Sequence, residues 1–182
     1  MNNSTTSVST SSVAKGNEFE AKVLKTLRNM NIDCQRVREL EAHRGRRLSG
    51  GDGGVDIFGN HDEYLILVQC KNYTTAKVGV GEIDAFEGVM SRYPRNTTIG
   101  IFISSAKDGY SRPAIARGEL SKYNMLLTNM LDMCQDIPGY LSRKLKDDSV
   151  AEKSRKIEEI ILALDQDQKR KIEALEEKIA TM

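Results

Sequence analysis

The apolar residues near the start of the chain recur with the spacing of a helix. They are separated by three or four residues, so that they fall on one face of a helix. This face consists of Phe19, Val23, Leu24 and Leu27. The pattern predicts a first core helix that begins at Gly16 and ends near the sequence NMNID.

Short apolar runs in the middle of the chain predict strands. Val55–Phe58 and Tyr64–Val68 flank the turn sequence GNHDE and predict a β-hairpin. Cys34–Val37 predicts a shorter strand before it. Thr98–Ser104, with the sequence TIGIFIS, is typical of a fully buried strand, and NMLLTN predicts a last strand at residues 124–129.

Helical patterns separate the later strands. Gly81–Tyr93 predicts a helix with an apolar face, Pro113 opens a second helix, and MLDMCQDIPGYL predicts a short third one. The apolar face of the first of these consists of Ile83, Phe86, Val89 and Met90. Because strands and helices interleave, the predicted fold class is α/β.

We divide the chain into three parts by composition. Residues 1–14 are rich in serine and threonine, with too little apolar surface to offset the entropy of ordering, and are predicted to be disordered. Residues 15–142 form the α/β domain. Residues 143–182 are predicted to form a charged amphipathic helix. Its apolar stripe consists of Ile157, Ile161, Leu164, Ile172, Leu175, Ile179 and Met182.

Two interpretations of this C-terminal stripe stay open. The interval from Ile161 to Ile172 breaks a strict seven-residue repeat, so a coiled coil would contain a stutter near Gln168. A weak homodimer through the C-terminal helix is then expected. Alternatively, the helix folds back on its own domain.

The composition fits one domain with a tail. The chain has 182 residues, of which 39% are apolar and 29% are charged, which is enough for one core. Its formal net charge is +1, so that any basic surface is a local patch. Cys34, Cys70 and Cys134 lie far apart without a CxxC spacing, and are predicted to be reduced, mostly buried thiols, with Cys70 in the core.

Sequence features also bear on localisation. No run approaches the roughly 20 apolar residues of a membrane span, so we expect a soluble, intracellular protein with no membrane partner. A serine-rich start without acidic residues is also typical of a mitochondrial presequence, but residues 1–14 contain no arginine. Mitochondrial targeting is therefore the weaker alternative.

The predicted hairpin carries polar residues where its two strands meet. Asp56 opens the first strand, and Gln69 and Lys71 follow the second. Side chains alternate along a strand, so that Leu67, Gln69 and Lys71 share one face and Cys70 lies on the other. Carboxylate and amide oxygens suit Mg²⁺, and a lysine stabilises charge on a phosphate. In the alternative interpretation, Asp56 caps a turn and Lys71 is a solvated strand end.

Three sequence stretches together resemble a known family. They are GNEFE at Gly16–Glu20, GGDGGVD at Gly50–Asp56 and VQCK at Val68–Lys71. This order resembles the Mrr-like branch of the PD-(D/E)XK nuclease superfamily, over about residues 15–140. The resemblance implies a restriction endonuclease-like core, in which helices flank a mixed central sheet, and Mg²⁺-dependent cleavage of DNA, with Mn²⁺ as a substitute.

The same resemblance implies roles for individual residues. Asp56 matches the motif aspartate, Gln69 the position that is often acidic in the wider superfamily, and Lys71 the catalytic lysine. Glu20 corresponds to a first-helix carboxylate that related resolvases place beside the metal. The implied metal ligands are therefore Asp56, Gln69 and Glu20. Because Gln69 is neutral, it brings one negative charge fewer to the cation than a glutamate would.

A basic loop precedes the implied site. Arg44, Arg46 and Arg47 lie just before the glycine-rich stretch, and arginine forks match phosphate oxygens, so that these residues are candidates for DNA binding. A solvated loop is the alternative. For the whole chain, the leading hypothesis is a Mg²⁺-dependent DNA endonuclease. The alternatives are a nuclease-fold DNA-binding module with little turnover, or an interaction protein that acts through its C-terminal helix.

Overall fold

The computed structural model describes residues 11–39, 54–73 and 75–180. The chain forms two compact units, Met1–Pro138 and Gly139–Met182. Of the sequence predictions, the disorder of residues 1–10 and the arginine loop with Arg44, Arg46 and Arg47 lie outside the described residues.

The first unit is built on a five-stranded mixed sheet with the order β1-β2-β3-β4-β5. The strands are β1 (Asp33–Arg36), β2 (Ile57–His61), β3 (Tyr64–Lys71), β4 (Thr98–Ser104) and β5 (Asn124–Asn129). β1, β2 and β3 pair antiparallel, whereas β4 is parallel to both β3 and β5. This arrangement confirms the predicted α/β class and the mixed central sheet.

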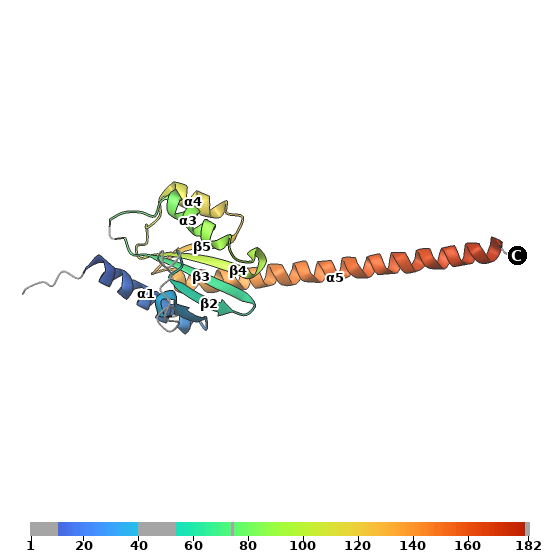
Figure 1. Ribbon diagram of the computed structural model, residues 1–182, viewed down its shortest axis with the longest axis horizontal. Coiled ribbons are helices and arrows are strands. Elements are labelled where there is room, and N and C mark those ends of the chain that lie inside the picture. Colours follow the sequence, from blue (N-terminus) through green and yellow to red (C-terminus); the bar gives the residue numbers. More distant parts are fainter. Residues whose placement is uncertain (1–10, 40–53, 74, 181–182) are drawn as a thin grey trace, which may run out of the picture. The chain divides into compact units, whose positions relative to one another are not determined.

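Helices cover both faces of the sheet (Figure 1). α3 (Val80–Met90) connects β3 to β4, and α4 (Arg112–Glu119) connects β4 to β5. Parallel strands with right-handed crossovers place successive helices on the same face, and α3 and α4 do lie together on one side (Figure 1). α1 (Ser12–Asn29) contacts β1 and β3 from the other side. A short 3₁₀ helix, Arg95–Thr97, leads into β4.

The core beneath α3 is tightly packed. Leu67 on β3 and Phe102 on β4 belong to one buried cluster with Ile83 and Phe86 of α3. Phe86 and Phe102 meet edge to face, with ring centroids 5.5 Å apart. A side chain at Gly100 would clash, because a Cβ there would lie 2.3 Å from the sulfur of Met90. The position of α3 over the end of the sheet is thus fixed by close packing.

α1 begins earlier than the sequence predicts. It starts at Ser12, and the hydroxyl of Ser11 accepts a hydrogen bond from the Ala14 N–H at 3.2 Å. A serine at this position satisfies an otherwise unpaired amide of the first turn, so that residues 12–14, predicted to be disordered, are helical.

The end of α1 matches the prediction. Asn31 has φ 59°, and the amides of Asn31 and Ile32 donate to the carbonyls of Arg28 and Leu27, which is a Schellman cap. The Arg28 guanidinium then donates to the Cys34 carbonyl at 3.0 and 2.8 Å, so that the helix end is bound to β1.

The predicted hairpin is confirmed, with a tighter turn than expected. β2 continues through Gly59 and Asn60 to His61, which pairs with Tyr64. Only Asp62 and Glu63 remain in the turn, and Asp62 adopts φ 50°. Aspartate tolerates this left-handed conformation better than most residues, so the five-residue turn GNHDE shortens to two residues.

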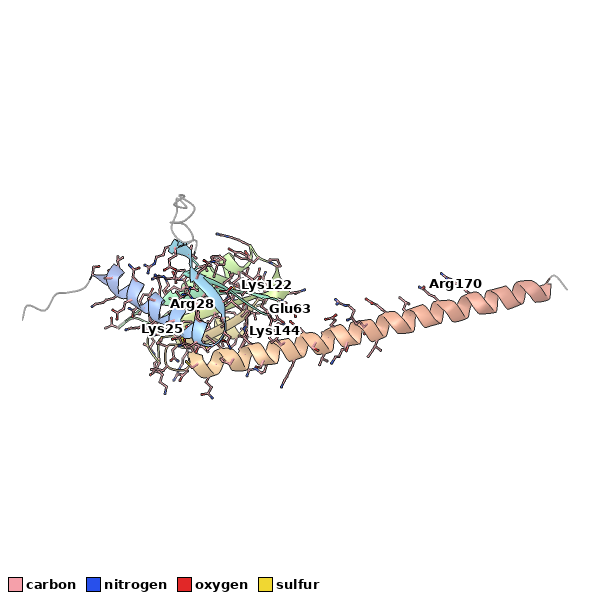
Figure 2. The ribbon with its side chains drawn as sticks, turned by 90° about the horizontal axis from the view of Figure 1, so that it is seen from below. Lys25, Arg28, Glu63, Lys122, Lys144 and Arg170 are labelled. Carbon is pink, nitrogen blue, oxygen red and sulfur yellow. The ribbon has the colours of Figure 1, made fainter. Side chains whose placement is uncertain are left out.

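The last helix is longer than predicted. The expected short helix and the expected C-terminal helix form one continuous helix, α5 (Met133–Ala180). Pro138 lies inside it, although proline cannot donate the backbone hydrogen bond of a helix interior. On α5, Val150, Ile157 and Leu162 are exposed apolar residues, and Arg170 projects outward (Figure 2). Within the described residues, no helix has both the length and the apolar character needed to cross a bilayer.

Candidate active site

The backbone around Asp56 is held on two sides. The Asp56 N–H donates to the Val68 carbonyl at 2.8 Å, and the Asp56 carbonyl accepts from the Val37 N–H at 3.0 Å. Gly54 has φ +84°, and a Cβ at this position would lie 2.9 Å from a methyl of Val89. A glycine is therefore required where the chain enters β2 beneath α3.

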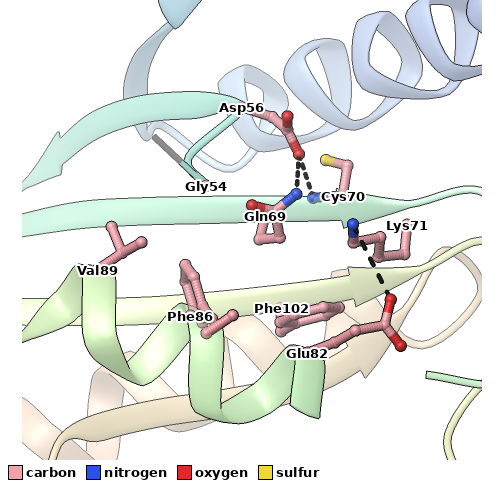
Figure 3. Close-up of a pocket in the computed structure, with 10 residues that line it drawn as sticks. Gly54, Asp56, Gln69, Cys70, Lys71, Glu82, Phe86, Val89 and Phe102 are labelled. Atoms are coloured by element: carbon pink, nitrogen blue, oxygen red, sulfur yellow. Dashed lines mark hydrogen bonds and ion pairs between the residues drawn. The ribbon is translucent and has the colours of Figure 1, made fainter. Parts of the chain in front are cut away.

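The carboxylate of Asp56 is buried and fixed to the end of β3. Its side chain is only 8% exposed. Its Oδ2 accepts a hydrogen bond from Gln69 Nε2 at 2.8 Å and another from the Cys70 N–H at 2.6 Å (Figure 3). Hydrogen bonds of this kind stabilise a buried carboxylate. They also direct the amide oxygen of Gln69 away from Asp56 (Figure 3).

Asp56, Gln69 and Lys71 line one pocket of about 480 Å³ on the α3 side of the sheet. Leu67 packs into the core beneath α3, and Gln69 and Lys71, the next two residues of its predicted face, line the pocket. The remaining lining comes from Gly54, Cys70, Glu82, Ala85, Phe86, Val89 and Phe102. The structure therefore brings together three of the four predicted catalytic residues.

Lys71 lies at the other end of this pocket. Its ammonium group is 4.0 Å from Glu82 Oε1, and the two side chains are 33% and 29% exposed. Figure 3 shows Lys71 directed toward Glu82 on α3, whereas Asp56 lies just before β2, on the other side of β3 from Glu82. The ammonium group of Lys71 thus lies near a carboxylate of α3, in a part of the pocket that solvent reaches.

Cys70 takes a larger part in the site than predicted. The prediction placed its side chain in the core on the opposite face of the strand. In the structure the residue is half-buried and lines the pocket, and its backbone N–H binds Asp56. Burial raises the pKa of the Cys70 thiol well above its ordinary value, and the charges of Asp56 and Glu20 raise it further. A thiol in this state is a poor nucleophile.

Glu20 lies near Cys70 but does not line the pocket. Its Oε2 is 3.7 Å from a terminal nitrogen of Arg38, and the same guanidinium donates to Asn17 on the next turn of α1. The negative charge of Glu20 raises the pKa of Cys70 at the end of β3. Glu20 is therefore a neighbour of the site, with Arg38 as an ion-pair partner.

One residue of the site, Glu82, was missed in the sequence. Glu82 lines the pocket beside Lys71, and the Tyr73 hydroxyl donates to it. The local sequence G-x-x-E at Gly79–Glu82 is a recognisable signal of a helix start, and the Gly79 N–H does donate to Glu82 Oε2 at 2.9 Å. That signal predicts the cap, but it does not predict that the capping carboxylate faces Lys71.

The donor set bears on metal binding. Among the described residues, no group of three or more histidine, cysteine, aspartate and glutamate side chains is arranged to hold a metal ion. The pocket does contain the Asp56 carboxylate and the Gln69 side-chain amide, whose oxygens are hard donors, and in this structure the nitrogen of the amide faces Asp56. Mg²⁺ commonly binds through one or two carboxylates and completes its coordination with water and substrate. The chemistry of the residues therefore fits Mg²⁺ better than a metal that needs a full set of protein ligands.

Comparison with known proteins identifies the family. The model of a restriction endonuclease family, the Mrr catalytic domain, matches residues 12–135. Because this match covers most of the chain, the protein belongs to the Mrr-type restriction endonuclease family, and its α/β unit is a nuclease domain of that family.

Two solved structures are similar to this chain, both with low sequence identity. One is the crystal structure of AF1548, a protein of unknown function, with TM-score 0.45 and 12% identity over 61% of this chain and 57% of that one. The other is the MspJI restriction endonuclease in complex with a 27-mer oligonucleotide, with TM-score 0.41 and 20% identity over 66% of this chain and 27% of that one. The chain thus spans only part of each. A search of curated proteins finds no match.

Proposed function

We propose that the protein is a divalent-metal-dependent endonuclease that hydrolyses phosphodiester bonds in DNA. The observation that carries this proposal is the meeting of Asp56, Gln69 and Lys71 in one pocket within a domain of a restriction endonuclease family. A buried carboxylate, a neutral amide and a half-exposed cation are the groups that a phosphate substrate and a hard cation require together.

Asp56 would hold the metal ion, together with Gln69 once its side-chain amide is turned so that the oxygen, and not the nitrogen, faces Asp56. Glu20 is the nearby carboxylate that we propose as a further ligand. A bound Mg²⁺ or Mn²⁺ ion would supply Lewis-acid catalysis and an activated water. The fold orders Asp56 before a cation binds, since the Cys70 N–H donates to its Oδ2. A carboxylate that is already ordered loses little freedom when a cation binds.

Lys71 would act on the phosphate itself. Its ammonium group lies in the same pocket as Asp56 and is 33% exposed, so that a DNA phosphate can approach it from solvent. A positive charge at this place stabilises the negative charge that develops on the phosphate oxygens during hydrolysis. Arg44, Arg46 and Arg47 remain the proposed contacts to flanking phosphates.

A second candidate is a DNA-binding module with little turnover. Two observations favour it: Gln69 contributes no negative charge, and Glu20 is paired with Arg38 at 3.7 Å. Both lower the expected affinity for a cation. DNA cleavage distinguishes the two candidates. A binding module binds DNA with or without a metal ion and leaves the strands intact.

The test is to incubate the purified protein with supercoiled, linear, methylated and branched DNA. Each reaction contains Mg²⁺, Mn²⁺, Ca²⁺ or a chelator. We expect Mg²⁺ and Mn²⁺ to support cleavage. Ca²⁺ should support DNA binding but much less cleavage, because its looser coordination places the attacking water poorly. Equal cleavage in the presence of the chelator would exclude the metal mechanism. Binding without cleavage under all conditions would favour the second candidate.

A further inference from the structure

Glu82 is held at both oxygens in the first turn of α3. The Gly79 N–H donates to Oε2 at 2.9 Å, and the Tyr73 hydroxyl donates to Oε1. Tyr73 follows β3 and Gly79 precedes α3, so that the carboxylate connects the end of the strand to the start of the helix. Its orientation is thus determined by the fold.

The oxygen that accepts from Tyr73 is also the one nearest to Lys71. Oε1 of Glu82 is 4.0 Å from the Lys71 ammonium, and both residues line the pocket that contains Asp56 (Figure 3). The hydrogen bond to Glu82 raises the pKa of Tyr73, and burial and the charge of Glu82 raise it further. Tyr73 therefore stays protonated and remains a hydrogen-bond donor to the carboxylate at neutral pH.

A helix cap alone does not account for this arrangement. Capping requires only the hydrogen bond between Oε2 and the Gly79 N–H, and leaves the other oxygen without a role. Here that other oxygen faces a lysine whose long side chain has many rotamers. A fixed anion beside the ammonium selects those rotamers that keep it at the mouth of the pocket.

We propose that Glu82, oriented by Tyr73, is a positioning residue that holds the ammonium of Lys71 at the place where the phosphate of the substrate enters. This inference rests on the proposed nuclease function and adds a requirement to it. The geometry of the lysine depends on α3 and on the segment between Lys71 and Gly79, and not only on the strand that carries it.

The test compares three variants with the wild-type protein. Glu82→Gln removes the charge but retains a side chain that can cap the helix, and Tyr73→Phe removes only the hydroxyl that orients Glu82. Asp84→Asn is the matched control, because Asp84 is on the same helix but pairs with Arg117 at 2.7 Å. For each protein, kcat and KM for plasmid cleavage and the melting temperature are measured.

We expect kcat to fall about 10-fold to 100-fold in Glu82→Gln, in the range by which precise placement of a reacting group affects rates. A smaller fall is expected in Tyr73→Phe. KM and the melting temperature should change little in both, and Asp84→Asn should cleave as the wild type does. A higher kcat in Glu82→Gln would mean that the carboxylate holds Lys71 away from the substrate, and would overturn the proposal, as would a kcat equal to that of the wild type.

A second measurement does not depend on cleavage. In protein labelled with ¹³C-lysine, the Cε resonance of Lys71 is assigned by its loss in Lys71→Arg. It should move in Glu82→Gln and in Tyr73→Phe, and stay in place in Asp84→Asn. If the wild-type protein fails to cut DNA, the nuclease function fails while this resonance still reports whether Lys71 is held by Glu82. A resonance that is insensitive to Glu82→Gln would overturn the positioning role.

Discussion

The two ends of the pocket are held in different ways. Asp56 is a buried residue whose carboxylate accepts from the backbone of β3, whereas the side chain of Lys71 is 33% exposed and its ammonium group lies 4.0 Å from a carboxylate of α3. The Asp56 end is thus part of the register of the sheet, and cannot move without breaking strand hydrogen bonds. The Lys71 end depends on the packing of one helix turn. The comparison indicates a rigid end, where we propose that the metal ion binds, and an adjustable end, where we propose that the phosphate binds.

The largest effect should come from the rigid end. Asp56→Asn is expected to reduce DNA cleavage by a factor of at least about 100, because it removes the negative charge that we propose binds the metal ion, while its amide oxygen can still accept from the Cys70 N–H. Asp62→Asn, at the hairpin turn, is the matched control, since asparagine also tolerates the φ of 50° found there. Cleavage rates of the two variants on supercoiled plasmid provide the measurement. Similar rates would remove Asp56 from the mechanism.

Gly54→Ala should disturb the same end indirectly. Alanine at φ +84° is strained, and its Cβ would meet Val89 at 2.9 Å, so the free energy of unfolding should fall by about 1–3 kcal/mol. Denaturant unfolding measures this loss. Because the strain lies two residues before Asp56, cleavage should decline as well. Gly88→Ala is the control, since a Cβ there meets nothing within 4 Å.

A smaller effect on cleavage is expected from removal of residues 147–182, which are most of the second unit. We propose that the second unit supports a weak homodimer, so truncation after Lys146 should reduce double-strand cutting more than nicking. The truncation keeps Leu141, which is only 4% exposed. Sedimentation across a concentration series tests the dimer. Full-length and truncated proteins that both remain monomeric at high concentration would contradict it.

The smallest expected effect concerns the thiol beside Asp56. Because burial raises the pKa of Cys70, little thiolate forms at pH 8, and Cys70 should react with iodoacetamide more slowly than the exposed Cys134. Asp56→Asn should speed the reaction at Cys70, because it removes a charge that opposes the thiolate. Mass spectrometry of the modified peptides gives both rates. Equal reactivity of the two cysteines would mean that the Asp56 end is open.

Much of the site follows from local sequence, and the rest depends on tertiary contacts. The strand Thr98–Ser104 was predicted with its observed bounds because every residue in it is buried. Alternation placed Gln69 and Lys71 together for a similar reason, as the pleat of β3 determines their face. These predictions needed only the pattern of neighbouring residues.

The misses arose where distant segments meet. No local pattern reveals that Glu82 faces Lys71, because the contact depends on how α3 packs over β3. The continuity of α5 was missed because Pro138 ordinarily ends or kinks a helix. The hydrogen bond from the Cys70 N–H to the Asp56 carboxylate was also missed. It depends on the register of the strands, whereas the sequence prediction considered only the face on which the Cys70 side chain lies.

The most direct test of the central claim compares Lys71→Ala with Lys77→Ala in Mg²⁺-dependent cleavage of supercoiled DNA. Lys77 is an exposed lysine in the segment between β3 and α3, and serves as the matched control. We expect Lys71→Ala to lose cleavage with little change in melting temperature, because its ammonium group acts on charge in the transition state rather than in packing. Lys77→Ala should cut as the wild type does. Full activity in Lys71→Ala would contradict the assignment of this pocket as the nuclease active site.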